Sequence, residues 1–83
     1  MPLYRKKPVV IEAVQFAPGE GFPGDVMLFL GDKGVYDAID DAIYIDTLEG
    51  KMKAKRSDMI IKGVQGEFYP CDFAVFEATY ERA

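Results

Sequence analysis

The first apolar stretch of the chain, Val9 to Phe16, is rich in β-branched residues and follows a proline. It stops at a cluster of proline and glycine residues between positions 17 and 24. β-branched side chains favour extended backbone, and clustered proline and glycine favour loops. The pattern therefore predicts a strand over Val9–Phe16 and a loop after it.

Five consecutive apolar residues follow the loop: Val26, Met27, Leu28, Phe29 and Leu30. Asp25 precedes them as a candidate N-cap and Gly31 follows them as a candidate helix stop, so we expect a short helix here. One helical face needs fewer apolar residues than five in a row. The helix is therefore expected either to be covered on most sides or to carry an interaction surface.

Residues 42–56 have the alternation of a β-hairpin, and Glu49-Gly50 is the candidate two-residue turn. This turn pairs Ile45 with Ala54 and Asp46 with Lys53. The register separates a mostly apolar face from a charged face, which predicts one buried and one solvated side. The expected core face consists of Ile43, Ile45, Thr47, Met52 and Ala54.

A second hairpin is predicted between residues 59 and 71, with Gln65-Gly66 as its turn. This register pairs Lys62 with Tyr69 and places Phe68 on the same face as Ile61. We therefore expect Lys62 and Tyr69 to lie side by side on the solvated face.

The end of the chain contains a proline and several aromatic residues. Pro70 cannot donate a ladder hydrogen bond, so we expect it at a strand end or a sheet edge. Asp72 can cap a single turn that carries Phe73 and Phe76, and Ala78–Glu81 predicts a short closing strand.

Together these elements predict one α+β domain over residues 1–83. Its architecture is a small antiparallel or mixed sheet of two hairpins plus N- and C-terminal strands, with one short helix; such a sheet can also curl into a half-barrel. The chain has 83 residues, of which 49% are hydrophobic, as in a globular domain. A core of this size gives marginal stability, so we expect dimerisation or a bound ligand to help.

The net charge is −4, and the charges are segregated along the chain. Residues 1–7 carry three positive charges and no negative one, residues 51–56 carry four more, and residues 8–50 are strongly acidic. These blocks form either a solvated surface or a surface that steers a phosphate or a partner. Lys51, Lys53 and Lys55 would follow phosphates in a nucleic-acid reader, but lysines on an exposed strand also block aggregation. Because the chain is acidic overall, we do not expect it to bind nucleic acid.

The hydropathy pattern also bears on the compartment. No apolar run approaches the roughly 18 residues of a membrane span. The charged start of the chain is not followed by the long apolar stretch of a secretory leader. We therefore expect a cytosolic protein without a membrane segment.

The chain offers little for catalysis. It has no histidine, the commonest general base and metal ligand. Its single cysteine, Cys71, excludes an intramolecular disulfide, and its place after Pro70 favours a small buried residue over a nucleophile. Asp37, Asp40 and Asp41 lack the spacing and the glycine of a calcium loop. We therefore expect no catalytic residues, no metal and no cofactor.

The best candidate for a binding site is a patch of Lys62, Glu67 and Tyr69 on the second hairpin. A cation, an acceptor and an aromatic plane close together suit a polar or anionic ligand. The alternative is that Lys62 covers the Tyr69 ring and pairs with Glu67, so that the three residues only stabilise the sheet.

Several segments together resemble a family of short proteins encoded by bacteriophages and prophages. These segments are SDMIIKGVQGEFYPC at residues 57–71, FEATY at 76–80, YRKKPVVIEAVQF at 4–16 and TLEG at 47–50. Ser57 stands where this family usually has glycine, and Met59 where it usually has tyrosine or tryptophan. Residues 17–42 have no close counterpart. The resemblance implies a phage origin and a shared fold more than a particular activity.

These observations lead us to expect a non-enzymatic phage accessory protein that acts by binding in the cytoplasm of the host bacterium. The partner would be a host protein, which it inhibits or modulates, or a second copy in a homodimer. The expected interface comprises Val26–Leu30 and the outward face of the sheet. The alternative is a small-ligand-binding or sequestering protein that uses Lys62, Glu67 and Tyr69.

Overall fold

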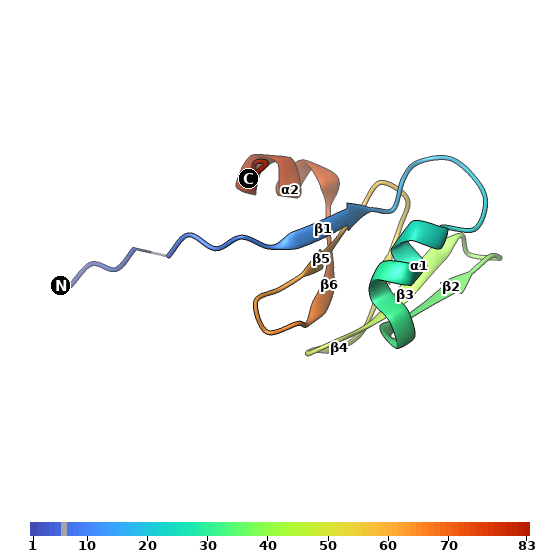
Figure 1. The fold of residues 1–83 in the computed structure, drawn as a ribbon, viewed down its shortest axis with the longest axis horizontal. Coiled ribbons are helices and arrows are strands. Elements are labelled where there is room, and N and C mark those ends of the chain that lie inside the picture. Colours follow the sequence, from blue (N-terminus) through green and yellow to red (C-terminus); the bar gives the residue numbers. More distant parts are fainter. Residues whose placement is uncertain (6) are drawn as a thin grey trace.

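The computed structural model describes residues 1–5 and 7–83. Along the chain the elements are β1 (Glu12–Gln15), α1 (Gly24–Leu30), the 3-10 turn η1 (Gly31–Lys33), β2 (Gly34–Asp37), β3 (Ala42–Thr47), β4 (Gly50–Ala54), β5 (Met59–Lys62), β6 (Phe68–Cys71) and α2 (Phe73–Thr79). The strands form two antiparallel three-stranded sheets, ordered β1-β5-β6 and β2-β3-β4 (Figure 1). The α+β class is confirmed, but the prediction of a single sheet is wrong.

The first hairpin has a different register from the predicted one. Thr47 pairs with Gly50, so that the turn is Leu48-Glu49 and Ile45 faces Met52. The Thr47 hydroxyl stabilises this turn, because it donates to the Gly50 carbonyl over 2.6 Å and accepts from the Glu49 amide over 3.1 Å. The register differs by two residues, which preserves the side-chain alternation. The predicted core face is therefore retained, although its Met52 end is exposed.

The second hairpin differs from its predicted register by one residue, and this inverts its faces. Lys62 pairs with Phe68 and Ile61 with Tyr69. The cause is one additional residue in the loop: Gly63 donates to the Glu67 carbonyl over 2.7 Å, and Gly66 adopts φ +81°. A left-handed residue at the end of a three-residue loop is typical of this hairpin type. Consequently Phe68 faces the main core, and Ile61 faces the opposite side of the sheet.

Two further elements of the fold differ from the prediction. Gly34–Asp37 forms β2, which was not predicted, and pairs with β3. The expected closing strand at Ala78–Glu81 is absent from the described residues, since α2 extends to Thr79. Asp72 caps α2 by accepting hydrogen bonds from two amides of its first turn, at 3.0 and 3.3 Å. Phe76 and Tyr80 stack one helical turn apart, with ring centroids 4.9 Å apart, and this contact favours helical backbone.

Pro70 lies in β6, an edge strand of its sheet, which confirms its predicted place.

The main core lies where α1 packs against both sheets. It is formed by Phe16, Val26, Leu30, Ile43, Ile45, Ala54 and Ile60. At its margin the rings of Phe29 and Phe68 meet edge to face, with centroids 5.4 Å apart. This contact joins α1 to β6 and helps to fix the two sheets relative to each other.

The described residues at the start of the chain, 1–5 and 7–8, project away from the domain (Figure 1). The strand predicted over Val9–Phe16 begins only at Glu12, and no secondary structure is assigned to the described residues before it. The Cα radius of gyration is 13.9 Å, compared with about 12 Å for a compact chain of this length. The projecting segment explains the difference. We call residues 1–8 the N-terminal arm.

Candidate binding groove

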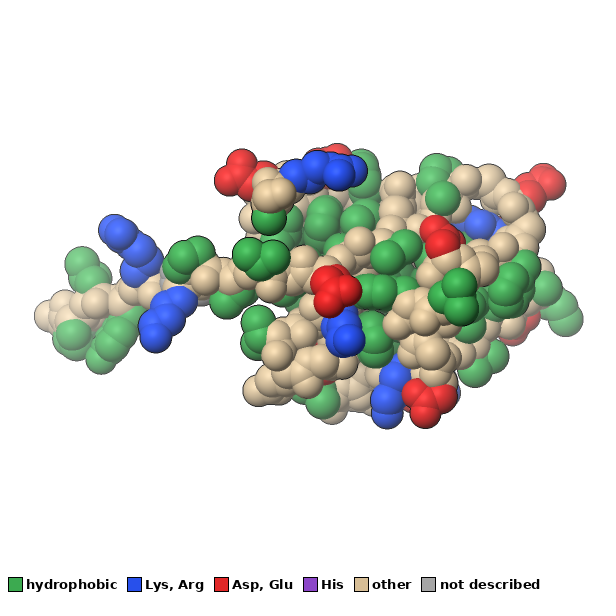
Figure 2. All heavy atoms as spheres, viewed as in Figure 1, with side chains coloured by type: hydrophobic (Ala, Val, Ile, Leu, Met, Phe, Trp, Pro, Cys, Tyr) green, Lys and Arg blue, Asp and Glu red, His purple; other side chains and the backbone are tan. Residues whose placement is uncertain are grey.

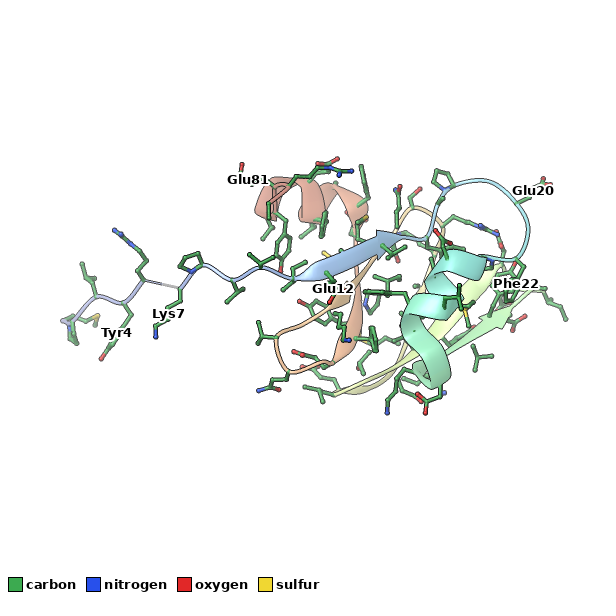
Figure 3. The ribbon with its side chains drawn as sticks, viewed as in Figure 1. Tyr4, Lys7, Glu12, Glu20, Phe22 and Glu81 are labelled. Carbon is green, nitrogen blue, oxygen red and sulfur yellow. The ribbon has the colours of Figure 1, made fainter. Side chains whose placement is uncertain are left out.

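A groove of about 620 Å³ lies on the side of the β1-β5-β6 sheet that faces away from the main core. It lies between α2 and the chain that leads into β1 (Figure 3). It is lined by Val9, Val10, Ile11, Ala13, Gln15, Met59, Phe73, Phe76, Glu77, Tyr80, Glu81, Arg82 and Ala83. The two ends of the chain thus form its two walls, and the sheet forms its floor.

Helical periodicity builds the aromatic wall of the groove. Phe73, Phe76, Glu77 and Tyr80 are separated by three or four residues, which places them on one side of α2. Phe76 and Tyr80 are partly buried, whereas Phe73 is exposed. The wall therefore combines aromatic surface with the carboxylate of Glu77 at its rim.

An ion pair between the exposed Lys55 and the buried Asp58 lies next to the start of α2. Asp58 is only 7% exposed and accepts from the Lys55 amide over 3.0 Å and from Lys55 Nζ over 2.6 Å. Lys55 Nζ also lies 3.5 Å from the carboxylate of Asp72, the N-cap of α2. The pKa of Lys55 is raised, first by the carboxylate of Asp58 and further by that of Asp72. This bridge joins the end of β4 to the start of α2.

The sheet beneath α2 carries two groups with raised pKa values. Burial, followed by the neighbouring Tyr80 phenol, raises the pKa of Tyr69 to about 12. Burial is also the main cause of the raised pKa of Cys71, a free and partly buried thiol. Both groups are protonated at neutral pH, so Tyr69 offers a hydroxyl and Cys71 offers little thiolate.

Lys62, Glu67 and Tyr69 do not form the single patch that was predicted. Lys62 Nζ lies 5.8 Å from the centroid of the Phe68 ring, on the core side of the sheet. Tyr69 points to the other side, because adjacent strand residues alternate. The Glu67 carboxylate turns back to accept from the Gln65 amide over 2.9 Å. The additional loop residue is the physical reason for this separation.

The apolar residues of α1 are mostly used by the fold. Val26 and Leu30 are buried in the core, and Met27 and Phe29 pack against it. Leu28 is the exception and is 87% exposed. Asp25 is not the N-cap, since α1 begins at Gly24; its carboxylate accepts from the Val26 amide over 2.8 Å. The interface predicted at Val26–Leu30 thus offers one fully exposed side chain and stays a prediction.

Arg56 anchors the loop before α1 in a way that the sequence did not predict. Its guanidinium lies 4.4 Å from the centroid of the Phe16 ring. It binds the Asp41 carboxylate and donates to the carbonyl groups of Ala17 and Gly21, at 3.2 and 2.7 Å. These partners are 15 to 39 residues away in sequence, so no local motif could have indicated them.

The aspartates of the β2-β3 turn are occupied by structural hydrogen bonds. Asp37 accepts from the amides of Ile39 and Asp40, and Asp40 accepts from the Tyr44 hydroxyl over 2.7 Å. Over residues 1–5 and 7–83, no group of three or more potential ligands that could hold a metal ion is found. Within the same residues, no helix has the length and apolar character needed to cross a bilayer.

Comparisons of the chain with protein-family models, curated proteins and solved structures found no match.

Proposed function

We propose that the protein is a non-enzymatic binding protein, and that the groove between α2 and Val9–Ile11 holds an apolar segment of another polypeptide. The observation that carries this proposal is the exposed apolar surface at the groove. Val9, Val10 and Phe73 line it and remain exposed in the isolated chain. Exposed apolar surface that is rimmed by polar groups is typical of interaction sites.

The chemistry of the described residues supports binding more than turnover. The raised pKa of Cys71 disfavours the nucleophilic thiolate. Asp41 and Asp58 are engaged in ion pairs within the fold. Together with the resemblance to short phage proteins, this supports a phage accessory protein that binds a host protein or its own copies in the bacterial cytoplasm.

A small ligand is a second candidate occupant of the same groove. Its volume, about 620 Å³, lies within the range of ligand pockets. The stacked rings of Phe76 and Tyr80 also provide a surface on which a planar group can pack. This replaces the alternative based on Lys62, Glu67 and Tyr69, because Lys62 and Tyr69 lie on opposite sides of the sheet.

A groove variant tests the proposal. Phe73→Ser removes an exposed aromatic wall residue, and Ile39→Ser removes an exposed apolar residue of the β2-β3 turn as a matched control. In pull-downs from a bacterial lysate, wild type and Ile39→Ser should retain a protein that Phe73→Ser loses. Capture of the same lysate protein by wild type and both variants would show that this protein binds outside the groove. Mass spectrometry of the purified protein would reveal a small ligand instead.

A further inference from the structure

The N-terminal arm exposes apolar side chains that find no partner within the described chain. Leu3 and Tyr4 are 93% and 92% exposed, respectively. Figure 2 shows hydrophobic and basic side chains along the projecting segment, and Figure 3 labels Tyr4 and Lys7 on it. Burial of such side chains stabilises a complex, because it removes apolar surface from water.

The arm and the rest of the protein have opposite charges. Residues 1–7 carry Arg5, Lys6 and Lys7 and no acidic residue. The remaining residues carry 7 basic and 14 acidic side chains (10 minus 3 basic, all 14 acidic), a net charge of −7. Glu77 and Glu81 stand at the groove beside a single basic residue, Arg82. The arm is therefore electrostatically complementary to the groove of its own protein.

The strand next to the groove has an open edge. The order β1-β5-β6 places β1 at the edge of its sheet, where β5 is its single strand partner in the described part of the chain. The outer backbone groups of such a strand can accept an added strand. Pro2 and Pro8 lack the N–H donor and so limit a ladder to the residues between them.

The arm is long enough to cross the groove. Its eight residues can extend over about 26 Å. The 7 residues of α2 span about 10 Å, and the 4 residues of β1 span about 13 Å.

The arm is poorly suited to enter the groove of its own chain. It continues outward from β1 (Figure 1), so it would have to reverse direction close to Val9–Ile11. These three consecutive residues are β-branched, a type that favours extended backbone. The chain has no glycine before Gly19 to form a tight turn. A second copy can supply an arm without this reversal.

This inference rests on the proposed function of the groove and names its occupant. We propose that the N-terminal arm of one copy lies in the groove of a second copy, and that the exchange is reciprocal in a two-fold symmetric homodimer. Leu3 and Tyr4 supply the apolar contacts with the aromatic wall of the partner copy. Arg5 and Lys7 meet the acidic rim. Two equivalent contacts form in one step, which makes the exchange cooperative.

Light scattering on the full chain at high micromolar concentration is the first test. Wild type and Ile39→Ser should have a mass close to twice 9.3 kDa. The double variant Leu3→Ser/Tyr4→Ser and the single variant Phe73→Ser should each dissociate at least tenfold more readily. High salt should also weaken the dimer, because it screens the contacts between arm and rim. The substituted residues are exposed in the isolated chain, so circular dichroism should show unchanged folding.

A mixture of the two weakened variants provides the second test. The arm variant retains an intact groove, and the Phe73→Ser variant retains an intact arm. Their mixture should therefore form a mixed dimer through one restored contact. When one copy is isotopically labelled, a zero-length cross-linker should join Lys7 of one copy to Glu77 or Glu81 of the other.

Three results would overturn the inference. One is a wild-type mass of 9.3 kDa at high micromolar concentration. Another is a dimer that the arm variant leaves intact but Leu28→Ser disrupts, which would assign the interface to α1. The third is cross-linking of Lys7 within single copies alone. None of these three results tests the proposed function. That function is tested separately, by the effect of Phe73→Ser on capture from lysate.

Discussion

Asp41, just before β3, and Arg56, just after β4, form a two-pronged ion pair at one end of the β2-β3-β4 sheet. The Nε and Nη2 atoms of Arg56 lie 3.0 and 2.7 Å from the Asp41 carboxylate oxygens, and the Tyr36 hydroxyl donates to the same carboxylate over 2.8 Å. Asp41 itself has φ +52°, a backbone conformation that aspartate and asparagine tolerate better than most residues. Because Arg56 also donates to the carbonyl groups of Ala17 and Gly21, it joins the β2-β3 turn to the loop before α1.

This ion pair predicts a stability that depends on pH. Arg56 first, and then Tyr36, hold the pKa of Asp41 below its usual 3.8. A carboxyl group with a lowered folded pKa stabilises the protein above its unfolded pKa, and this contribution is lost as the pH falls through the folded value. Asp41→Asn should therefore lower the melting temperature at neutral pH, and the difference from wild type should shrink below pH 3.8.

Asparagine retains the left-handed backbone, so the change tests the charge. Glu49→Gln in the exposed turn between β3 and β4 provides a control and should differ little from wild type at any pH. A pH-independent difference between Asp41→Asn and wild type would show that the charge of Asp41 is not the cause.

One cross-strand pair of the first hairpin combines a buried side chain with an exposed one. Ile45 faces Met52, but Ile45 is fully buried and Met52 is 42% exposed. Ile45→Ala should lower the free energy of unfolding by about 2–5 kcal/mol. Met52→Ala should lower it by less than about 1 kcal/mol. Urea denaturation measures both, and equal losses would contradict the burial of this face.

Ser57 offers a stabilising substitution. Its φ of +80° is costly for a residue with a Cβ atom, whereas glycine adopts it freely. Ser57→Gly should therefore raise the free energy of unfolding by about 1 kcal/mol. Ser57→Ala is the matched control, because it removes the hydroxyl and keeps the Cβ atom. A similar gain in both variants would assign the effect to the hydroxyl.

Two glycines near α1 should respond differently to alanine. A Cβ atom at Gly34 would lie 2.5 Å from Cδ1 of the buried Leu30, whereas one at Gly24 would lie 3.9 Å from Phe22. Gly34→Ala should cost about 1–3 kcal/mol by overpacking. Gly24→Ala should be neutral or stabilising because alanine favours helix. Thermal melts of equal midpoint would contradict the tight contact at Gly34.

The two hairpins show how far a sequence pattern can predict a fold. In the first, the predicted turn lies one residue beyond the observed turn, Leu48-Glu49, and the alternation survives. Ile43, Ile45 and Ala54 are buried as predicted, whereas Met52 is exposed. In the second, the left-handed Gly66 adds one residue to the loop, and every facing assignment on one strand inverts. The number of residues in the loop was therefore the missing information, because the residue types at a turn do not determine that number.

The groove could not have been predicted from any one segment. Its walls come from opposite ends of the chain, and α2 was predicted to end in a strand. The spacing of Phe73, Phe76 and Tyr80 is helical, and this signal could have identified the wall. The contacts of Arg56 depend on the tertiary fold and have no local signal.

The position of the two walls has a consequence for protein synthesis. Val9–Ile11 leave the ribosome early, but they have no groove to line until β5, β6 and α2 have also been translated, since β1 pairs with β5 and α2 follows β6. A nascent chain that stops before Phe73 therefore lacks the aromatic wall altogether. If the groove binds as proposed, a product truncated before Phe73 lacks the binding site and cannot compete with the finished protein.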